Sequence, residues 1–266
     1  MMLKQFFTAV VTTLLLLTQH LAMAGSTQQN YFQVVFDTTH TVADGYTTGF
    51  GYAVYVNYDG VEFLFDTGED GNVLLQNLKR AKVDVSKLKF AAISHDHHDH
   101  AGGLRNVRDV SPDMKVYIAP GHSVGVGDAE EVQDNIKITP NIMLLRTHTE
   151  TPTAGISDEV SLLLLTKKGP YLFTGCSHTG VGTIVDKASK LAGANIYHYT
   201  GGSRLVHNPP EHTNEVAQIL KQRNVAHISP AHCSVSHEVD RVFKTAFPTR
   251  YVSSKLGEKV MLELAE

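Results

Sequence analysis

The sequence lacks tryptophan, has only two cysteines and shows no excess of positive charge. Lys and Arg together number 23 against 27 Asp and Glu, which gives a formal net charge of −4. A chain of this charge has no bulk positive field to attract a nucleic-acid backbone, so a general nucleic-acid binder is excluded. Hydrophobic residues make up 42% and charged residues 19% of the chain, and this balance rules out intrinsic disorder as the main state.

Beyond the N-terminal region, the sequence has no apolar segment long enough to span a membrane. Lys4 precedes an apolar stretch over residues 6–17, and residues 22–24 read Ala-Met-Ala. This pattern predicts a secretory signal peptide over residues 1–24, because a stretch of about 12 residues is shorter than a membrane anchor. We therefore expect a soluble mature chain, residues 25–266, that is periplasmic or secreted and meets oxidising conditions.

Residues 25–266 contain no linker and no repeat with a period of about 20 to 50 residues, so we expect one domain. In the first half, apolar patterns indicate strands and one helix. The expected strands cover residues 31–36, 52–57, 61–65 and 90–93, and the helix covers residues 73–81. Residues 58–60 read Tyr-Asp-Gly, which predicts a hairpin turn between the second and third strands.

The second half repeats this order of strands and helices without repeating the sequence. Residues 160–165 and 171–173 are expected strands that flank a turn at residues 168–170. Apolar stripes at helical spacing follow over residues 181–191, 216–220 and 235–243. Two halves of this kind in one domain predict an α/β fold in which two sheets face each other with helices outside, a four-layer αββα sandwich.

Several of the 15 histidines cluster in residues 94–103, which read Ser-His-Asp-His-His-Asp-His-Ala-Gly-Gly after an apolar strand. An extended backbone would project His95, His97 and Asp99 to one side, because strand side chains alternate. His100 would begin the turn into a helix and face a neighbouring point, which suits a second metal ion. The alternative is a His-rich or solvated loop, but such a loop has no reason to lie between a buried strand and a Gly-Gly turn.

The pattern His-x-His-x-Asp-His followed by Ala-Gly-Gly resembles the signature of the metallo-β-lactamase superfamily of metal-dependent hydrolases. Residues 61–68 look like an earlier strand of that superfamily that ends in Asp-x-Gly, and residues 172–178 and 230–233 look like its later motifs. The Gly-Cys-Ser-His and His-Cys forms are similar to the branch that contains the dihydropterin ribofuranosylaminobenzene phosphate synthases.

The resemblance implies a site with two divalent metal ions, zinc first, with manganese or iron as alternatives. It implies that one ion is held by His95, His97 and His178, and the other by Asp99, His100 and His232, with Cys176 close enough to ligate or bridge. A bridging hydroxide would be the nucleophile, and Asp99 would orient it and handle its proton. Asp66 would act behind the ligands by orienting the metal site.

Taken alone, two of these residues have other interpretations, and a third has a rival. Asp66 precedes Thr-Gly and could cap a turn. Cys176 could be a small buried apolar residue. His148 is the rival of His178 as the third ligand of the first ion, because it lies between chain segments, as third ligands of the superfamily often do.

The sequence departs from the synthase branch at residues 201–205, which read Gly-Gly-Ser-Arg-Leu where that branch has Gly-Gly-Phe-His-Leu. Arg204 is therefore a candidate for binding an anionic group of the substrate, with His207 as a weaker candidate beside it. A solvated surface arginine is the alternative. Because a secreted protein does not suit intracellular pterin synthesis, that activity is not carried over.

The two cysteines would ordinarily be expected to form a disulfide in an oxidising compartment. Cys176 and Cys233 each lie within two residues of a proposed ligand, so both segments converge on the metals. Coordination favours the thiolate, and we therefore predict that Cys176 is a free thiol facing the site. Cys233 is predicted to point away, into the start of the following helix.

These observations predict a secreted or periplasmic metal-dependent hydrolase that acts on a small molecule. Three alternatives remain: a non-hydrolytic synthase or transferase of the pterin-like branch, a diiron oxidoreductase of the same fold, and a periplasmic metal-binding protein. The superfamily places many reactions on one scaffold, so lactam, lactone, thioester and phosphodiester bonds all remain candidates. The sequence carries no signal for the oligomeric state.

Overall fold

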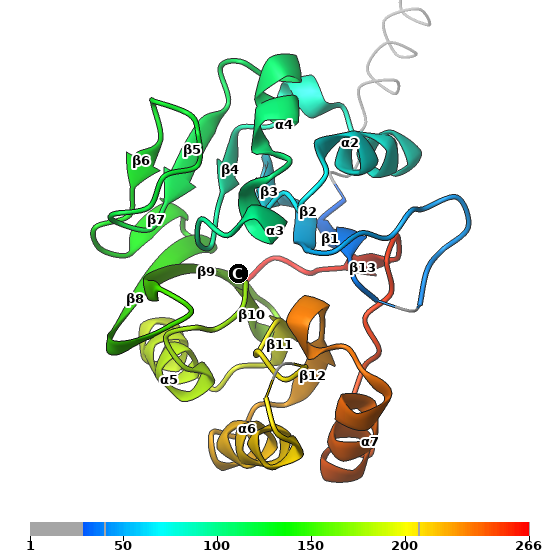
Figure 1. Ribbon diagram of the computed structural model, residues 1–266, viewed down its shortest axis with the longest axis vertical. Helices are drawn as coiled ribbons and strands as arrows, with labels where there is room; N and C mark the ends of the chain where they lie inside the picture. Colours follow the sequence, from blue (N-terminus) through cyan, green and yellow to red (C-terminus); the bar gives the residue numbers. More distant parts are fainter. Residues whose placement is uncertain (1–28, 40, 207, 266) are drawn as a thin grey trace, which may run out of the picture.

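The computed structural model describes residues 29–39, 41–206 and 208–265. The expected signal peptide, residues 1–24, and His207 lie outside the described residues. The described residues form two β-sheets that face each other, with helices on the outer face of each sheet (Figure 1). The predicted four-layer α/β sandwich is therefore confirmed.

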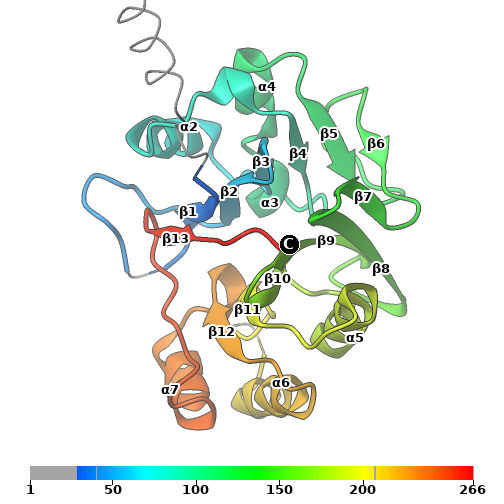
Figure 2. The same cartoon turned by 180° about the vertical axis from the view of Figure 1, so that it is seen from behind.

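Within the described residues, the first sheet has seven strands in the order β13-β1-β2-β3-β4-β5-β6. These strands are β1 (Tyr31–Asp37), β2 (Tyr52–Tyr58), β3 (Val61–Phe65), β4 (Phe90–Ala92), β5 (Lys115–Ile118), β6 (Glu130–Glu131) and β13 (Lys259–Met261). The predicted hairpin joins β2 and β3, and its Asp59 and Gly60 adopt φ angles of 50° and 78°, which suit a tight hairpin turn. β3, β4 and β5 run parallel. The last strand, β13, returns to pair with β1 (Figure 2).

The second sheet has six strands in the described part of the chain, in the order β12-β11-β10-β9-β8-β7. They are β7 (Ile136–Thr139), β8 (Ile142–Thr153), β9 (Ile156–Thr166), β10 (Gly169–Thr174), β11 (His198–Gly201) and β12 (His227–Pro230). β10, β11 and β12 run parallel, whereas β8 and β9 form a long antiparallel pair. The parallel arrangement places the ends of β10, β11 and β12 at one edge of the sheet.

The helices separate into two outer layers (Figure 1). They are α2 (Gly71–Arg80), α3 (His98–Ala101), α4 (Leu104–Val110), α5 (Val181–Ala192), α6 (Pro210–Gln222) and α7 (His237–Ala246), with short 3₁₀ turns η1 (Val85–Lys87) and η2 (His232–Ser234). Asp70 caps α2, because its carboxylate accepts hydrogen bonds from the first turn, and Ser236 caps α7 by accepting from Val239 N at 3.1 Å. α2 and α4 cover the first sheet, and α5, α6 and α7 cover the second.

Three apolar cores hold these layers together. The core between the sheets includes Phe32 and Phe173, whose rings meet edge to face at 4.9 Å. Leu74 contributes to the core beneath α2, and Ile184 and Phe243 to the core beneath α5 and α7. Full burial of such a side chain contributes about 1.5–3 kcal/mol, so the cores fix the sheets that carry the loops of the site. None of the described helices combines the length and apolar character needed to cross a membrane.

Candidate metal centre

The candidate site lies where parallel strands of both sheets end. β3 and β4 run parallel in the first sheet, and β10, β11 and β12 run parallel in the second. Side chains that follow such strands gather at the carboxyl edge, where α/β folds commonly place their functional sites. The segments after these strands form two groups of His, Asp and Cys side chains whose ligand atoms all lie within 4.8 Å of one another in each group.

The first group consists of His95, His97 and His178. His95 Nε2 lies 3.1 Å from His97 Nδ1. After β4 the chain bends at Ser94 and Asp96 and is extended at His97, and it brings these two alternate side chains into one group. It then turns into α3 at His98, so the expectation that Asp99 projects to the same side by strand alternation is wrong.

Neighbouring groups fix which nitrogen of His95 and His97 faces the group. Ser94 Oγ donates its only hydrogen to Asp66 Oδ2 at 2.9 Å. Ser94 Oγ therefore accepts the hydrogen bond from His95 Nδ1, which lies 2.9 Å away. His97 Nε2 donates to the carbonyl oxygen of Ala154 at 3.2 Å. The lone pairs of His95 Nε2 and His97 Nδ1 are therefore left for a metal ion.

His178 completes the first group from the loop after β10. Its Nδ1 lies 2.9 Å from the carbonyl oxygen of Thr153, to which it donates when Nε2 keeps its lone pair. The 2.8 Å approach of Arg204 Nη1 to Nδ1 is then a contact between two donors and not a hydrogen bond. Its Nε2 is buried and has no hydrogen-bond partner in the described structure. Because a buried polar atom without a partner costs about 1–3 kcal/mol, this nitrogen fits a metal ligand.

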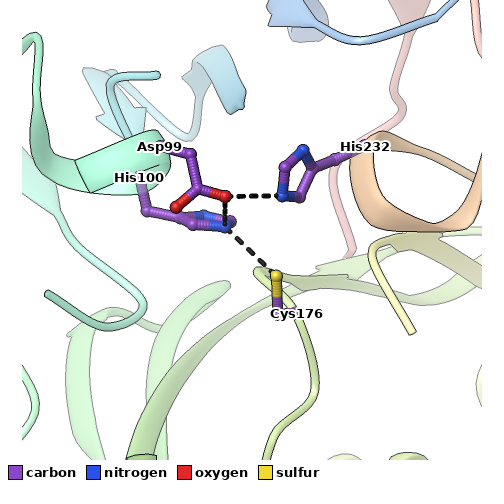
Figure 3. A group of neighbouring side chains, drawn as sticks. All are labelled: Asp99, His100, Cys176 and His232. Atoms are coloured by element: carbon purple, nitrogen blue, oxygen red, sulfur yellow. Dashed lines mark hydrogen bonds and ion pairs between the residues drawn. The ribbon is translucent and has the colours of Figure 1, made fainter. Parts of the chain in front are cut away.

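The second group consists of Asp99, His100, Cys176 and His232 (Figure 3). Asp99 Oδ2 lies 3.0 Å from His232 Nε2 and 3.6 Å from His100 Nε2. Cys176 Sγ lies 3.3 Å from His100 Nε2. Asp99 and His100 come from α3, Cys176 from the loop after β10 and His232 from η2, so three segments far apart in the sequence meet here (Figure 3).

Asp66 supports the second group from behind. His100 Nδ1 donates to Asp66 Oδ2 at 2.7 Å, and Ser94 N donates to Asp66 Oδ1 at 2.6 Å. Both Asp66 and His100 are fully buried. The Asp66 carboxylate fixes the orientation and the tautomer of the His100 ring, so that His100 Nε2 faces the second group. This arrangement agrees with the orienting role expected of Asp66.

The pKa values of His95, His178 and Asp99 favour the protonation states that metal ligands need. The pKa values of two other members are raised instead, because Asp66 outweighs burial at His100 and the hydrogen bond with Cys233 raises the pKa of the Cys176 thiol. Burial lowers the pKa of His95, and burial together with the charge of Arg204 lowers the pKa of His178 to about 3. Both rings are therefore neutral at pH 7. Burial raises the pKa of Asp99, but the hydrogen bond from His232 and the charge of His100 outweigh this effect and hold the pKa below its ordinary value.

The structure places His148 outside both groups. This residue lies within β8 rather than on a link between elements, and its side chain is 44% exposed. Its ring nitrogens face Asp158 at 3.0 Å and Glu150 at 3.1 Å. The structure therefore favours His178 as the third member of the first group.

The cysteines are only partly as predicted. Both are free and buried, and Cys176 faces the second group as expected. The prediction that Cys233 points away is wrong, because its Sγ lies 3.3 Å from Cys176 Sγ. The reason is that η2 begins at His232 and turns the next side chain back toward the loop after β10.

Four residues of the site were not found by sequence reasoning. They are Ser94, described above, and Glu159, Asp37 and Thr38. Glu159 Oε2 accepts from Thr179 N at 2.8 Å, and its Oε1 lies 4.0 Å from His95 Nδ1. Asp37 accepts from His232 N at 2.8 Å, and Thr38 Oγ1 lies 3.3 Å from His232 Nδ1. A signal was present for Glu159 and Asp37, since an acidic residue in or ending an apolar strand is uncommon in a core.

The fold, with two adjacent groups of side chains able to hold metal ions, is that of one known class of protein. The model of the metallo-beta-lactamase superfamily matches residues 46–232, and the chain belongs to this superfamily. The resemblance found in the motifs is confirmed at this level.

The chain is similar to relatives with different activities. The 7,8-dihydropterin-6-methyl-4-(beta-D-ribofuranosyl)-aminobenzene-5'-phosphate synthase of Methanocaldococcus jannaschii is 24% identical over 236 residues, which cover 70% of this chain and 80% of the relative. The cytoplasmic hydroxyacylglutathione hydrolase of Arabidopsis thaliana is 36% identical over 98 residues, 36% of this chain and 37% of the relative.

Two solved structures show the same fold. Tm1679, a metal-dependent hydrolase of the beta-lactamase superfamily, aligns with a TM-score of 0.72 at 23% identity and covers 89% of this chain and 100% of its own. The metallo-beta-lactamase fold protein YhfI of Bacillus subtilis aligns with a TM-score of 0.59 at 15% identity and covers 88% of this chain and 99% of its own.

Proposed function

We propose that this protein is a metal-dependent hydrolase that uses two divalent cations, zinc by preference. The observation that carries the proposal is the pair of ligand groups, in which the outer nitrogens of His95, His97 and His100 are each held by a neighbouring oxygen. That arrangement leaves the inner nitrogens free to bind metal. A storage site has no need for such an oriented outer layer.

The donor atoms suit zinc. The first group offers three imidazoles, and the second offers two imidazoles, one carboxylate and one thiol. Zinc binds nitrogen, sulfur and carboxylate oxygen, whereas magnesium and calcium prefer oxygen alone. Manganese and iron remain alternatives, because geometry and availability decide selectivity among transition metals.

Asp99 is the residue proposed to handle the proton. Bound divalent ions supply polarisation of a carbonyl or phosphoryl oxygen and lower the pKa of water. The Asp99 side chain is 18% exposed, whereas those of His100 and His232 are fully buried, so Asp99 can reach an incoming molecule. Its lowered pKa keeps it ionised, and an ionised carboxylate can orient a water molecule by accepting its hydrogen bond.

A second candidate is a synthase or transferase that needs the same metals. The similarity to the Methanocaldococcus synthase favours it, because that similarity covers most of both chains. Absence of turnover on hydrolase substrates by metal-loaded protein would favour this candidate over hydrolysis.

We also propose export to the periplasm or the medium, which rests on the signal-peptide pattern of residues 1–24. Cell fractionation and N-terminal sequencing test it, and the expected mature protein starts near Gly25. An uncleaved chain in the cytoplasm would contradict export without affecting the proposed chemistry.

The test of the hydrolase proposal is a panel of chromogenic lactam, lactone, thioester and phosphodiester substrates, assayed with the metal-loaded protein. We expect turnover of at least one bond type and its loss after chelation. Activity that survives complete removal of metal would contradict the proposal.

A further inference from the structure

A cavity of about 470 Å³ lies beside the first ligand group, between the start of α5 and α6. His178 and Arg204 line it on the side of the metal centre. Val216 and Ile219 of α6 supply apolar surface, and Thr183 of α5 supplies a hydroxyl group. A small molecule with a polar end and an apolar body matches this lining.

The cavity contains one arginine, Arg204, that has no acidic partner among the described residues. Arg223 is paired with Asp186 through two hydrogen bonds of 2.8 and 2.7 Å, so these two charges balance each other. No carboxylate of the described residues forms an ion pair with Arg204, whose guanidinium contacts His178 Nδ1 through Nη1. Its Nε and Nη2 are therefore available to two oxygens of one anion.

The loop that carries Arg204 is held tightly at its backbone. A Cβ atom at Gly202 would lie 2.3 Å from the carbonyl oxygen of Gly175 and 2.6 Å from Cys233 Sγ, so only glycine fits. Arg204 N donates to Cys233 Sγ at 3.3 Å, and Asn208 Nδ2 donates to the carbonyl oxygen of Arg204. These hydrogen bonds fix the backbone of Arg204, which reduces the conformational entropy that the side chain loses when it binds a ligand.

The start of α5 adds further donors to the same cavity. Gly180 precedes the helix without a side-chain cap, and Gly180 and Gly182 have no side chains to cover its first turn. Backbone N–H groups at a helix start favour an anion. This feature adds to the unpaired guanidinium, which is the primary observation.

We infer that the substrate carries an anionic oxygen group, a carboxylate or a phosphate, joined to an apolar body, and that Arg204 binds this group in the cavity while the scissile bond lies at the metal centre. Only the position of the scissile bond at the metal centre rests on the proposed function. Anion binding by Arg204 is testable without turnover.

The experiment measures binding of three ring-containing probes to the metal-loaded protein by calorimetry: phenylphosphonate, phenylacetate and the neutral phenylacetamide. Arg204→Met is compared with the wild type and with Arg241→Met, which removes an exposed charge from α7. We expect Arg204→Met to weaken binding of at least one anionic probe by about tenfold, because it removes a charge-assisted pair of hydrogen bonds. Arg241→Met should bind all probes like the wild type. A phosphate is indicated if phenylphosphonate shows the larger loss, and a carboxylate if phenylacetate does.

Anions can also bind directly to the metals, but that contribution is common to the wild type and Arg204→Met. Equal binding of both anions by these two proteins overturns the inference, as does failure of the wild type to bind either anion. If Arg204 controls binding but no bond of the hydrolase panel is cleaved, the inference stands and the hydrolase proposal fails. If turnover occurs and Arg204→Met does not change anion binding, the hydrolase proposal stands and the inference fails.

Elemental analysis accompanies every binding measurement. If Arg204→Met changes the metal content, Arg204→Gln replaces it, because glutamine keeps a polar side chain beside His178 but removes the charge and the pair of guanidinium donors. We then expect about tenfold weaker binding of at least one anionic probe, with no change for the neutral probe. Unchanged anion binding in Arg204→Gln would overturn the inference in that case.

Discussion

At the scale of single residues, Asp66 organises more of the centre than any proposed ligand does. Its two oxygens accept from Ser94 N, Ser94 Oγ and His100 Nδ1, and all three residues are buried. Ser94 Oγ, which is held by Asp66, in turn accepts a hydrogen bond from His95 Nδ1 and orients that ring. One carboxylate therefore orients one ring in each ligand group.

Asp66→Asn should reduce metal affinity while the fold is kept. An amide N–H₂ in place of one oxygen would oppose the N–H of His100 and turn the ring or its tautomer. Loss of such an orienting partner costs about 10–100-fold in metal affinity. Competition with a chromophoric chelator measures this, with the exposed Asp109→Asn as the control. An unchanged affinity would show that Asp66 only shapes the turn.

Asp99→Asn should keep most of the fold and lose about a hundredfold or more in turnover, because it removes a proposed ligand and a proposed proton acceptor together. Steady-state kinetics and circular dichroism on the same preparation measure the two effects. Near-normal turnover would exclude the proposed role of Asp99.

At the scale of elements, the spacing of apolar residues predicted the helices and strands that bury one face. The apolar stripe of residues 181–191 became α5, and the turn at residues 58–60 became the β2–β3 hairpin. β8 was not predicted, because much of its outer half is exposed and carries no apolar alternation. The pairing of β13 with β1 and the contact of Ser94 with Asp66 join distant segments, and no local pattern encodes such contacts.

The second sheet contains a buried histidine that links stability to pH. Burial lowers the pKa of His198 on β11 to about 4, below the ordinary value of 6.5. Its contribution to stability is complete above pH 6.5 and is lost as the pH falls toward 4, up to about 3 kcal/mol.

His198→Gln should therefore lose less stability than the wild type between pH 7 and pH 4.5, as measured by urea unfolding. Ser229→Ala is the matched control, since it removes the hydroxyl 2.8 Å from His198 Nε2 but keeps the imidazole. This control should keep the wild-type pH dependence at lower overall stability. Identical pH dependence in His198→Gln and the wild type would contradict the assignment.

The loop after β10 and η2 bring two thiols within 3.3 Å without a bond between them. If Cys176 binds metal, the thiolate is retained and both cysteines stay reduced even after export. Intact-mass analysis after alkylation of unreduced, chelated and denatured protein should find two labels. No label would mean that a disulfide forms instead.

At the scale of the whole molecule, segments that follow strands of both sheets meet at one candidate site. The local motif at residues 94–103 indicated the candidate site from sequence, because His95 and His97 lie two residues apart and come together in the fold. The motif could not specify the outer layer, since Glu159 of β9, Asp37 at the end of β1 and Thr38 just after it reach the site from segments far away in the sequence. Cys233 was misplaced for the same reason, because its direction depends on the geometry of η2.

The most direct test of the two-metal hydrolase is to return zinc stepwise to the chelated protein while metal content and turnover of the best panel substrate are measured together. We predict about two bound ions per chain at full activity, and about one in His95→Ala or His97→Ala, with activity abolished. Full turnover by the metal-free protein would contradict the account, and so would a fully loaded protein that cleaves none of the four bond types.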